Sequence, residues 1–278
     1  MRFLAVLAFY LILGLCQFSL AASSPEALQC ITDFTKKFDE MSGGYRATML
    51  KTEYINSAKG VTHKIEIRDS KKEIILKFLD EAYSGIKNNG MTIRYDSTAL
   101  LKIKFGHSAG LGFLMNGAAR LFAAKEIALT DSQALKGEVF TVNRAGLSYL
   151  AATLKKNLLQ FQNGELGDLT LIEAPCKVRY KLHEAPVQIV DLKVGDSIFD
   201  IEEKFSTLAF ILFKENEDQF KQFDLLFNRK KEIKMKISAG FTPFEIDIDP
   251  VKKMPTRFVL FLKDKIIGEY KFSDIESL

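Results

Sequence analysis

The sequence is poor in the residues that most often bind metals and cofactors. It has no tryptophan, three histidines and three cysteines in 278 residues. His63, His107 and His183 are scattered, and none has a second histidine four residues away or a Cys-x-x-Cys pair beside it. Metal sites in proteins normally show such spacing. We therefore expect neither a metal ion nor another cofactor.

The chain also lacks a strong excess of charge of one sign. Its 39 basic and 35 acidic residues give a formal net charge of +4, which is too small to indicate a nucleic-acid partner. The one basic run, at 229–231, is interpreted as a solvated turn, with contact to anionic lipid as the alternative. An apolar fraction of 47% is enough for a folded core and excludes a disordered chain.

Long apolar runs are absent except at the start of the chain. Arg2 is followed by an apolar stretch from Phe3 to Leu15 and then by small residues up to Ala22. A stretch of roughly 13 residues is too short for the ~20 that a spanning helix needs. Residues 1–22 are predicted to be a removable secretory signal, with an uncleaved anchor as the alternative. The remainder, 23–278, is expected to be one domain without a transmembrane span, in the periplasm or secreted.

Removal of the signal would leave two cysteines, Cys30 and Cys176. An oxidising compartment favours their pairing. We therefore predict one structural disulfide between them, although the sequence does not show that they lie close together.

The periodicity of apolar residues predicts a mainly β protein with two long helices. Apolar positions repeat every three or four residues over 25–41 and again over 145–161, which is typical of amphipathic helices. Between and after them the period changes to two. Strands are expected at 45–55, 61–68, 73–79, 91–96, 98–105, 176–183, 187–194, 207–213, 232–237, 244–248, 257–262 and 266–272, with a short helix around Phe220–Phe227.

Short connections with turn residues join the first five strands into an expected antiparallel meander. In the last hairpin Phe258, Leu260 and Leu262 face one side, while Val259 and Phe261 face the other. Both faces are apolar, so both must be covered. Helices can cover one face, and a second sheet or a cavity for an apolar ligand can cover the other.

One segment matches a catalytic motif. Gly106-His107-Ser108-Ala109-Gly110 fits the G-x-S-x-G pattern of α/β-hydrolases, in which Ser108 would attack an acyl carbon. The preceding strand, however, carries Lys102 and Lys104, and no histidine stands late enough in the chain for that fold. We interpret the motif as a Gly-rich turn and keep a serine esterase as a minor alternative. The protein is otherwise expected not to be an enzyme.

The order of elements and several short motifs resemble the superfamily of the outer-membrane lipoprotein carrier LolA, including an exported bacterial family of unknown function within it. The motifs are Gly44–Glu53, Asn89–Tyr95, Val142–Leu147, Ile246–Arg257 and Gly268–Asp274. The segment from Glu202 to Lys231 departs from this pattern because it is longer and richer in phenylalanine.

The resemblance implies a curved, antiparallel, incomplete β-barrel with helices packed on its concave face. It also implies a non-enzymatic carrier or binder of an apolar ligand, either a lipid or the acyl chain of a lipoprotein. Residues 109–122 would form a lid over the ligand. The residues expected to bind it are Phe105, Leu111, Phe113, Leu114, Met115, Leu121 and Phe122, with Phe258, Leu260 and Phe261 from the sheet.

A second hypothesis gives the same fold a solid core. The protein would then be a structural or interaction module of the cell envelope, with a protein partner and no ligand. An elongated apolar cavity beneath residues 109–122 would favour the first hypothesis over the second.

Overall fold

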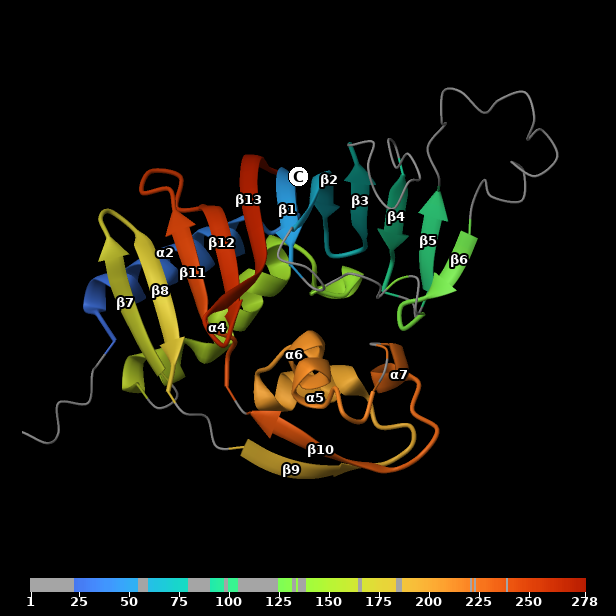
Figure 1. Cartoon of the computed structure of the whole chain (residues 1–278). Coiled ribbons are helices and arrows are strands. Elements are labelled where there is room, and N and C mark those ends of the chain that lie inside the picture. Colours follow the sequence, from blue (N-terminus) through green and yellow to red (C-terminus); the bar gives the residue numbers. More distant parts are fainter. Residues whose placement is uncertain are drawn as a thin grey trace, which may run out of the picture.

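The fold was determined as a computed structural model of the whole chain (Figure 1). The structure describes residues 23–278 apart from 55–59, 80–90, 98–99, 105–124, 132–133, 135–138, 165–166, 184–186, 221, 223 and 239. The predicted signal, the predicted lid and the G-x-S-x-G motif lie outside the described residues.

Most of the chain forms one antiparallel sheet of eleven strands, in the order β6-β5-β4-β3-β2-β1-β13-β12-β11-β8-β7. The strands are β1 (Tyr45–Glu53), β2 (Val61–Asp69), β3 (Ile74–Phe78), β4 (Thr92–Tyr95), β5 (Leu100–Lys104), β6 (Lys125–Ala128), β7 (Gly167–Glu173), β8 (Lys177–Leu182), β11 (Phe244–Ile248), β12 (Pro255–Leu262) and β13 (Lys265–Ser277). The predicted meander is confirmed for β1 to β5, and β6 extends it. The first strand lies beside the last, and β6 and β7 are the two edge strands of the sheet among the described residues. The curved sheet is therefore not closed into a barrel. This agrees with the incomplete barrel that the resemblance implied.

Two long helices, α2 (Pro25–Glu40) and α4 (Leu147–Asn163), pack on the concave face of the sheet (Figure 1). Ser24 caps the start of helix α2, because its side chain accepts a hydrogen bond from the amide of Ala27 at 3.3 Å. Helix α4 ends at Gly164, whose φ of 64° is a left-handed conformation that glycine adopts readily. Both helices were predicted, and their apolar faces are buried.

The start of helix α4 rests on two residues of the sheet. The hydroxyl oxygen of Tyr45 accepts a hydrogen bond from the amide of Leu147 at 2.7 Å, and the Asp69 carboxylate accepts one from Ser148. Tyr45 and Asp69 are opposite each other on β1 and β2. Gly146 precedes the helix with a φ of +91°, and a Cβ there would lie 2.2 Å from the Tyr45 hydroxyl. Only glycine therefore fits this junction without a shift of backbone or ring.

The buried Asp69 predicts a pH dependence of stability. Burial raises its pKa to about 6, against the hydrogen bond from Ser148 that lowers it, whereas an unfolded chain has about 3.9. The folded state holds the proton more tightly, so this stabilisation is complete below about pH 4 and is lost as the pH rises through 6. Between about pH 4 and about pH 8 the free energy of unfolding should fall by about 3 kcal/mol because of this group. Chemical denaturation across this range should show a fall about 3 kcal/mol smaller in Asp69→Asn than in the wild type, and parallel profiles would contradict it.

Residues between β8 and β11 leave the main sheet and form a small unit of their own (Figure 1). It contains a two-stranded sheet of β9 (Val187–Leu192) and β10 (Ile233–Ser238), with α5 (Ile198–Phe205), α6 (Ala209–Glu215) and α7 (Asp224–Phe227). Its apolar core is separate from that of the main sheet and includes Leu192, Leu212 and Met235. The chain then returns as β11, which pairs with β8. This unit contains the segment in which the sequence departs from the LolA-like pattern.

The prediction of a strand at 207–213 is wrong. Most of this segment belongs to helix α6, in which Ala209, Phe210, Ile211 and Leu212 are all buried. A short apolar run that is buried on every side has no polar face, so its sequence shows neither period. Helix α5 and strands β6 and β7 were not predicted.

A buried ion pair joins the small unit to the main fold. Arg144 is the last residue of the 3-10 turn Val142–Arg144, and its Nε lies 3.0 Å from Oε2 of Glu202 in α5. The guanidinium also donates to the Tyr149 hydroxyl at 3.0 Å and to the Phe199 carbonyl at 3.1 Å. Burial raises the pKa of Glu202 to about 7, although the charge of Arg144 and the amide of Ala209 oppose this shift.

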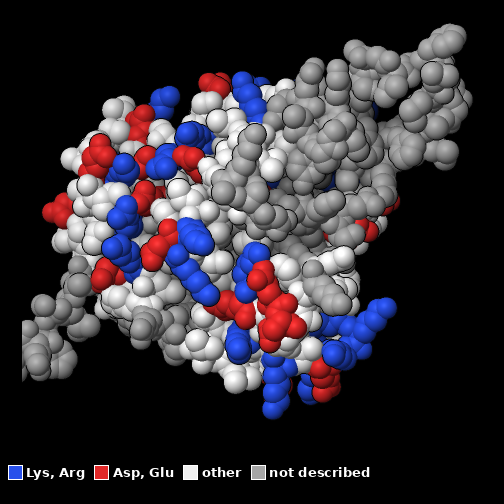
Figure 2. Space-filling model, in the orientation of Figure 1, with Lys and Arg blue, Asp and Glu red and all other residues white. Residues whose placement is uncertain are grey.

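The convex face of the last strands is charged. Arg179, Glu245, Val259 and Glu269 lie side by side on β8, β11, β12 and β13. Arg257 pairs with Glu269 at 2.7 Å, and Arg179 pairs with Glu245. Figure 2 shows basic and acidic residues interspersed over the described part of this surface. Val259 is fully buried among these charged side chains. The sequence analysis considered a second sheet or a cavity as the cover for this face of the last hairpin, and Val259 needs neither.

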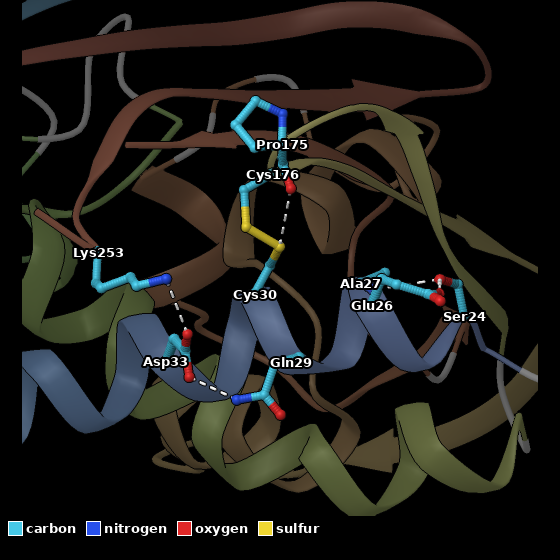
Figure 3. The surroundings of a disulfide bond; sticks show 9 residues. All are labelled: Ser24, Glu26, Ala27, Gln29, Cys30, Asp33, Pro175, Cys176 and Lys253. Atoms are coloured by element: carbon cyan, nitrogen blue, oxygen red, sulfur yellow. Dashed lines mark hydrogen bonds and ion pairs between the residues drawn. A yellow bond between two sulfur atoms is a disulfide. The ribbon is translucent and has the colours of Figure 1, made fainter. Parts of the chain in front are cut away.

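The predicted disulfide is present. Cys30 of α2 is bonded to Cys176, the residue just before β8, with a Cα–Cα distance of 5.9 Å (Figure 3). On the same helix, Asp33 accepts a hydrogen bond from Gln29 at 2.6 Å and pairs with Lys253 at 3.1 Å. The bond links α2 to the turn before β8, the strand next to edge strand β7, across a sequence separation of 146. No helix in the described residues is long and apolar enough to cross a membrane.

Candidate ligand-binding cavity

A cavity of about 230 Å³ lies between the concave face of the sheet and helix α4. The sheet side is mostly aliphatic and aromatic. It is formed by Met49, Ile65, Leu76, Phe78, Met91, Ile93, Leu101, Ile103, Phe258, Leu260 and Phe272. The alternation of side chains along each strand places these residues on one face, because every second residue points toward the helices.

The opposite wall comes from α4 and the segment before it. Phe140, Val142, Ala145, Tyr149 and Leu150 contribute most of its apolar surface. Leu208, just before α6, completes it together with Phe241 and Thr242, which lie between β10 and β11. The cavity therefore depends on contacts between segments that are far apart in the sequence.

One part of the cavity wall is polar. Lys51, Glu53, His63 and Tyr270 line it, and we call these four residues the polar cluster. Tyr270, Lys51 and His63 are neighbours in register on β13, β1 and β2, so they form a row across three strands. The Lys51 Nζ lies 3.3 Å from Oε2 of Glu53, and the Tyr270 hydroxyl donates to Oε1 of Glu53 at 2.6 Å.

The polar cluster is as deeply buried as the apolar wall. The side chains of Lys51 and Glu53 are 7% and 3% exposed, and His63 and Tyr270 are 2% and 4% exposed. The ring of Tyr270 lies over Gly268, where a Cβ would come within 2.7 Å of the hydroxyl. The absence of a side chain at 268 therefore lets Tyr270 reach Glu53.

Two of the predicted ligand-binding residues line this cavity, namely Phe258 and Leu260. Phe261, next in the chain, is partly buried and is not among the lining residues. The remaining predicted residues lie outside the described part of the chain: Phe105, Leu111, Phe113, Leu114, Met115, Leu121 and Phe122. For these seven, a role in binding stays a prediction.

The polar cluster was missed by the sequence analysis. A signal for it exists, because Lys51 and Glu53 continue the alternation of Tyr45, Ala47 and Met49 and therefore belong to the same inward face of β1. His63 has the same phase as Ile65 and Ile67 on β2. Polar residues in phase with a buried apolar series are the pattern that would have revealed the cluster.

The histidines do not form a metal site in the described residues, where no group of three potential ligands comes together. His63 lines the cavity. His183 lies at the surface, with its Nε2 3.0 Å from Asp168. Ser108, on which the esterase hypothesis depends, lies outside the described residues, so that hypothesis stays untested.

Comparisons with known proteins give only distant likenesses. No protein-family model matches the sequence, and no curated protein matches it. Among solved structures, the fold is similar to a LolA superfamily protein from Nitrosomonas europaea, at 9% identity and a TM-score of 0.38 over 89% of this chain and 93% of that one. It is also similar to LprF from Mycobacterium bovis, at 11% identity and a TM-score of 0.38 over 92% and 96%.

A third similar structure is a putative outer membrane lipoprotein-sorting protein domain from Vibrio parahaemolyticus, at 8% identity and a TM-score of 0.29 over 90% of this chain and 91% of that one. The LolA superfamily thus appears among the structural neighbours as well as in the sequence resemblance. With TM-scores below 0.5, these likenesses carry no argument about function, which has to rest on the cavity and its lining.

Proposed function

We propose that this protein is a non-enzymatic carrier or binding protein for an apolar ligand, namely a lipid or the acyl chain of a lipoprotein. The observation that supports this most is the cavity between sheet and helix. Its volume of about 230 Å³ exceeds the roughly 150 Å³ of an apolar protein cavity that binds benzene. It therefore has room for a short segment of hydrocarbon chain.

The lining supplies the driving force for binding. Its walls are mainly aliphatic and aromatic side chains, and each methylene group transferred from water into such surroundings contributes roughly 0.8 kcal/mol. A core filled by its own side chains, as the envelope-module hypothesis requires, would leave no such space. The cavity thus favours a ligand-binding role over a purely structural one.

The proposal also places the protein outside the cytoplasm, in the periplasm or secreted. The predicted leader at 1–22 and the Cys30–Cys176 disulfide support this, because structural disulfides persist in oxidising compartments and are rare in the cytosol.

Because the chain has no tryptophan, a single introduced indole can report on the cavity. In Phe258→Trp the indole replaces a cavity-lining ring, so an alkyl or acyl chain with a terminal bromine should quench its fluorescence as the chain binds. We expect saturable quenching of at least about twofold if the ligand lies against this wall. Fluorescence titration measures the effect directly.

Leu50→Trp is the matched control, because Leu50 is 39% exposed on the other face of β1. Quenching there should be weak and unsaturable. Equal quenching of both variants, or consistently empty protein in native mass spectrometry after addition of alkyl ligands, would count against the proposed function.

A further inference from the structure

Building on the proposed function, we propose that the polar cluster binds the polar end of the ligand. We further propose that this end is uncharged and both donates and accepts hydrogen bonds, as an amide or a hydroxyl group does. A free carboxylate or an ammonium group would bind less well.

The position of the polar cluster supports a role in binding. Its four side chains lie on the wall of the cavity, in line with the apolar residues that would hold the hydrocarbon. Met49, two residues before Lys51, and Ile65, two residues after His63, both line the same cavity. A ligand with an apolar chain beside Met49 and Ile65 would therefore bring its end to the polar cluster.

The charges of the cluster determine the kind of end group. Lys51 and Glu53 are the only Lys, Arg, Asp or Glu among the described residues that line the cavity. They pair with each other at 3.3 Å, so their charges cancel. A carboxylate would be repelled by Glu53 and an ammonium by Lys51, and either would lose its hydration without gaining a net counter-charge.

An uncharged end avoids this cost. A Lys ammonium is a donor only, and an ionised carboxylate is an acceptor only. The carbonyl of an amide can accept from Lys51 while its N–H donates to Glu53, and a hydroxyl group can do both. The neighbouring Tyr270 hydroxyl already donates to Glu53 at 2.6 Å, which holds the carboxylate in place for such a contact.

Stability alone does not explain the polar cluster. Replacing a buried ion pair by apolar side chains of similar volume is often neutral or stabilising, and the rest of this wall is apolar. Two charged side chains below 8% exposure therefore point to a ligand.

The first test uses the wild-type protein and four octyl compounds that differ only at their end: octanamide, octanol, octanoate and octylammonium. Isothermal titration calorimetry near neutral pH should show that octanamide and octanol bind about tenfold more tightly than either ion. Equal affinity for all four compounds, or preference for an ion, would overturn the inference and leave the proposed function intact. Binding of none of them would contradict the proposed function itself.

Two variants change the charge of the polar cluster in opposite directions. Glu53→Gln removes the carboxylate charge that pairs with Lys51, so octanoate should gain about tenfold in affinity. Lys51→Met leaves Glu53 without its counter-charge, so octylammonium should gain instead. Circular dichroism checks that each variant is folded, and the wild-type series decides the question if either is not.

The matched controls are Glu66→Gln and Lys77→Met. These two residues are a cross-strand pair on β2 and β3, at positions that alternate with the inward-facing ones. The two substitutions make the same chemical changes on the face of the sheet that points away from the cavity. The order of affinities for the four compounds should therefore stay that of the wild type. If Glu53→Gln and Lys51→Met also keep the wild-type order, the polar cluster does not select the end group.

Discussion

Replacing Cys30 and Cys176 together by alanine should lower the free energy of unfolding by about 5 kcal/mol. The disulfide closes a loop between residues that are 146 positions apart, so it removes much of the conformational freedom of the unfolded chain. It joins helix α2 to the start of strand β8 near one edge of the sheet, where β7 is the last of the described strands. A loss of this size is comparable with the whole stability of many single domains.

Urea denaturation of the double variant and of the oxidised wild type measures this difference. The reduced wild type is the control, because it keeps both sulfur atoms and loses only the bond between them. Its midpoint should agree with that of the variant. Two free thiols on labelling the unfolded, unreduced wild type would show that the bond does not form.

Removing the Arg144 side chain should have the next largest effect, about 3–5 kcal/mol for Arg144→Met. The substitution leaves the Glu202 carboxylate buried with no cation beside it, and it removes the hydrogen bonds to Tyr149 and Phe199. Because burial already raises the pKa of Glu202 to about 7, the loss of Arg144 should raise that pKa further. The destabilisation should therefore be larger at about pH 8 than at about pH 5, where the carboxyl group is protonated in the folded variant.

A double-mutant cycle tests the origin of this effect. Arg144→Met combined with Glu202→Gln should recover part of the stability at about pH 8, because glutamine is uncharged and still accepts from the amide of Ala209. Arg46→Met is the control, since Arg46 and Glu276 form an exposed pair at 2.8 Å that should contribute less than about 1 kcal/mol. A loss for Arg144→Met no larger than that of the control would show that the pair does not hold the two units together.

The sequence predicted the regular part of the fold well. Strands β1 to β5 alternate apolar and polar residues and are joined by short connections, so pairing between consecutive strands was the simplest arrangement. The helices at 25–41 and 145–161 show one apolar stripe each, because one side faces the sheet and the other faces water. In these elements the burial pattern follows directly from the local sequence.

Elements that are buried on all sides were harder to predict. The segment at 207–213 is apolar throughout, so only its surroundings decide that it becomes helix α6 instead of a strand. The alternation of β1 places Lys51 and Glu53 on its inward face, but it does not show how deeply the two side chains are buried. Their burial is a property of the assembled sheet and helix.

The sequence by itself determined the alternation along the strands, the two amphipathic helices and the pair of cysteines available for a disulfide. These features depend on residues that are near one another in the chain, or on a simple count. Only the tertiary structure decided that a cavity remains beneath α4 and that a charged pair lines it. The walls of that cavity come from positions between Met49 and Phe272, and the distance between such segments is set by how the whole chain packs.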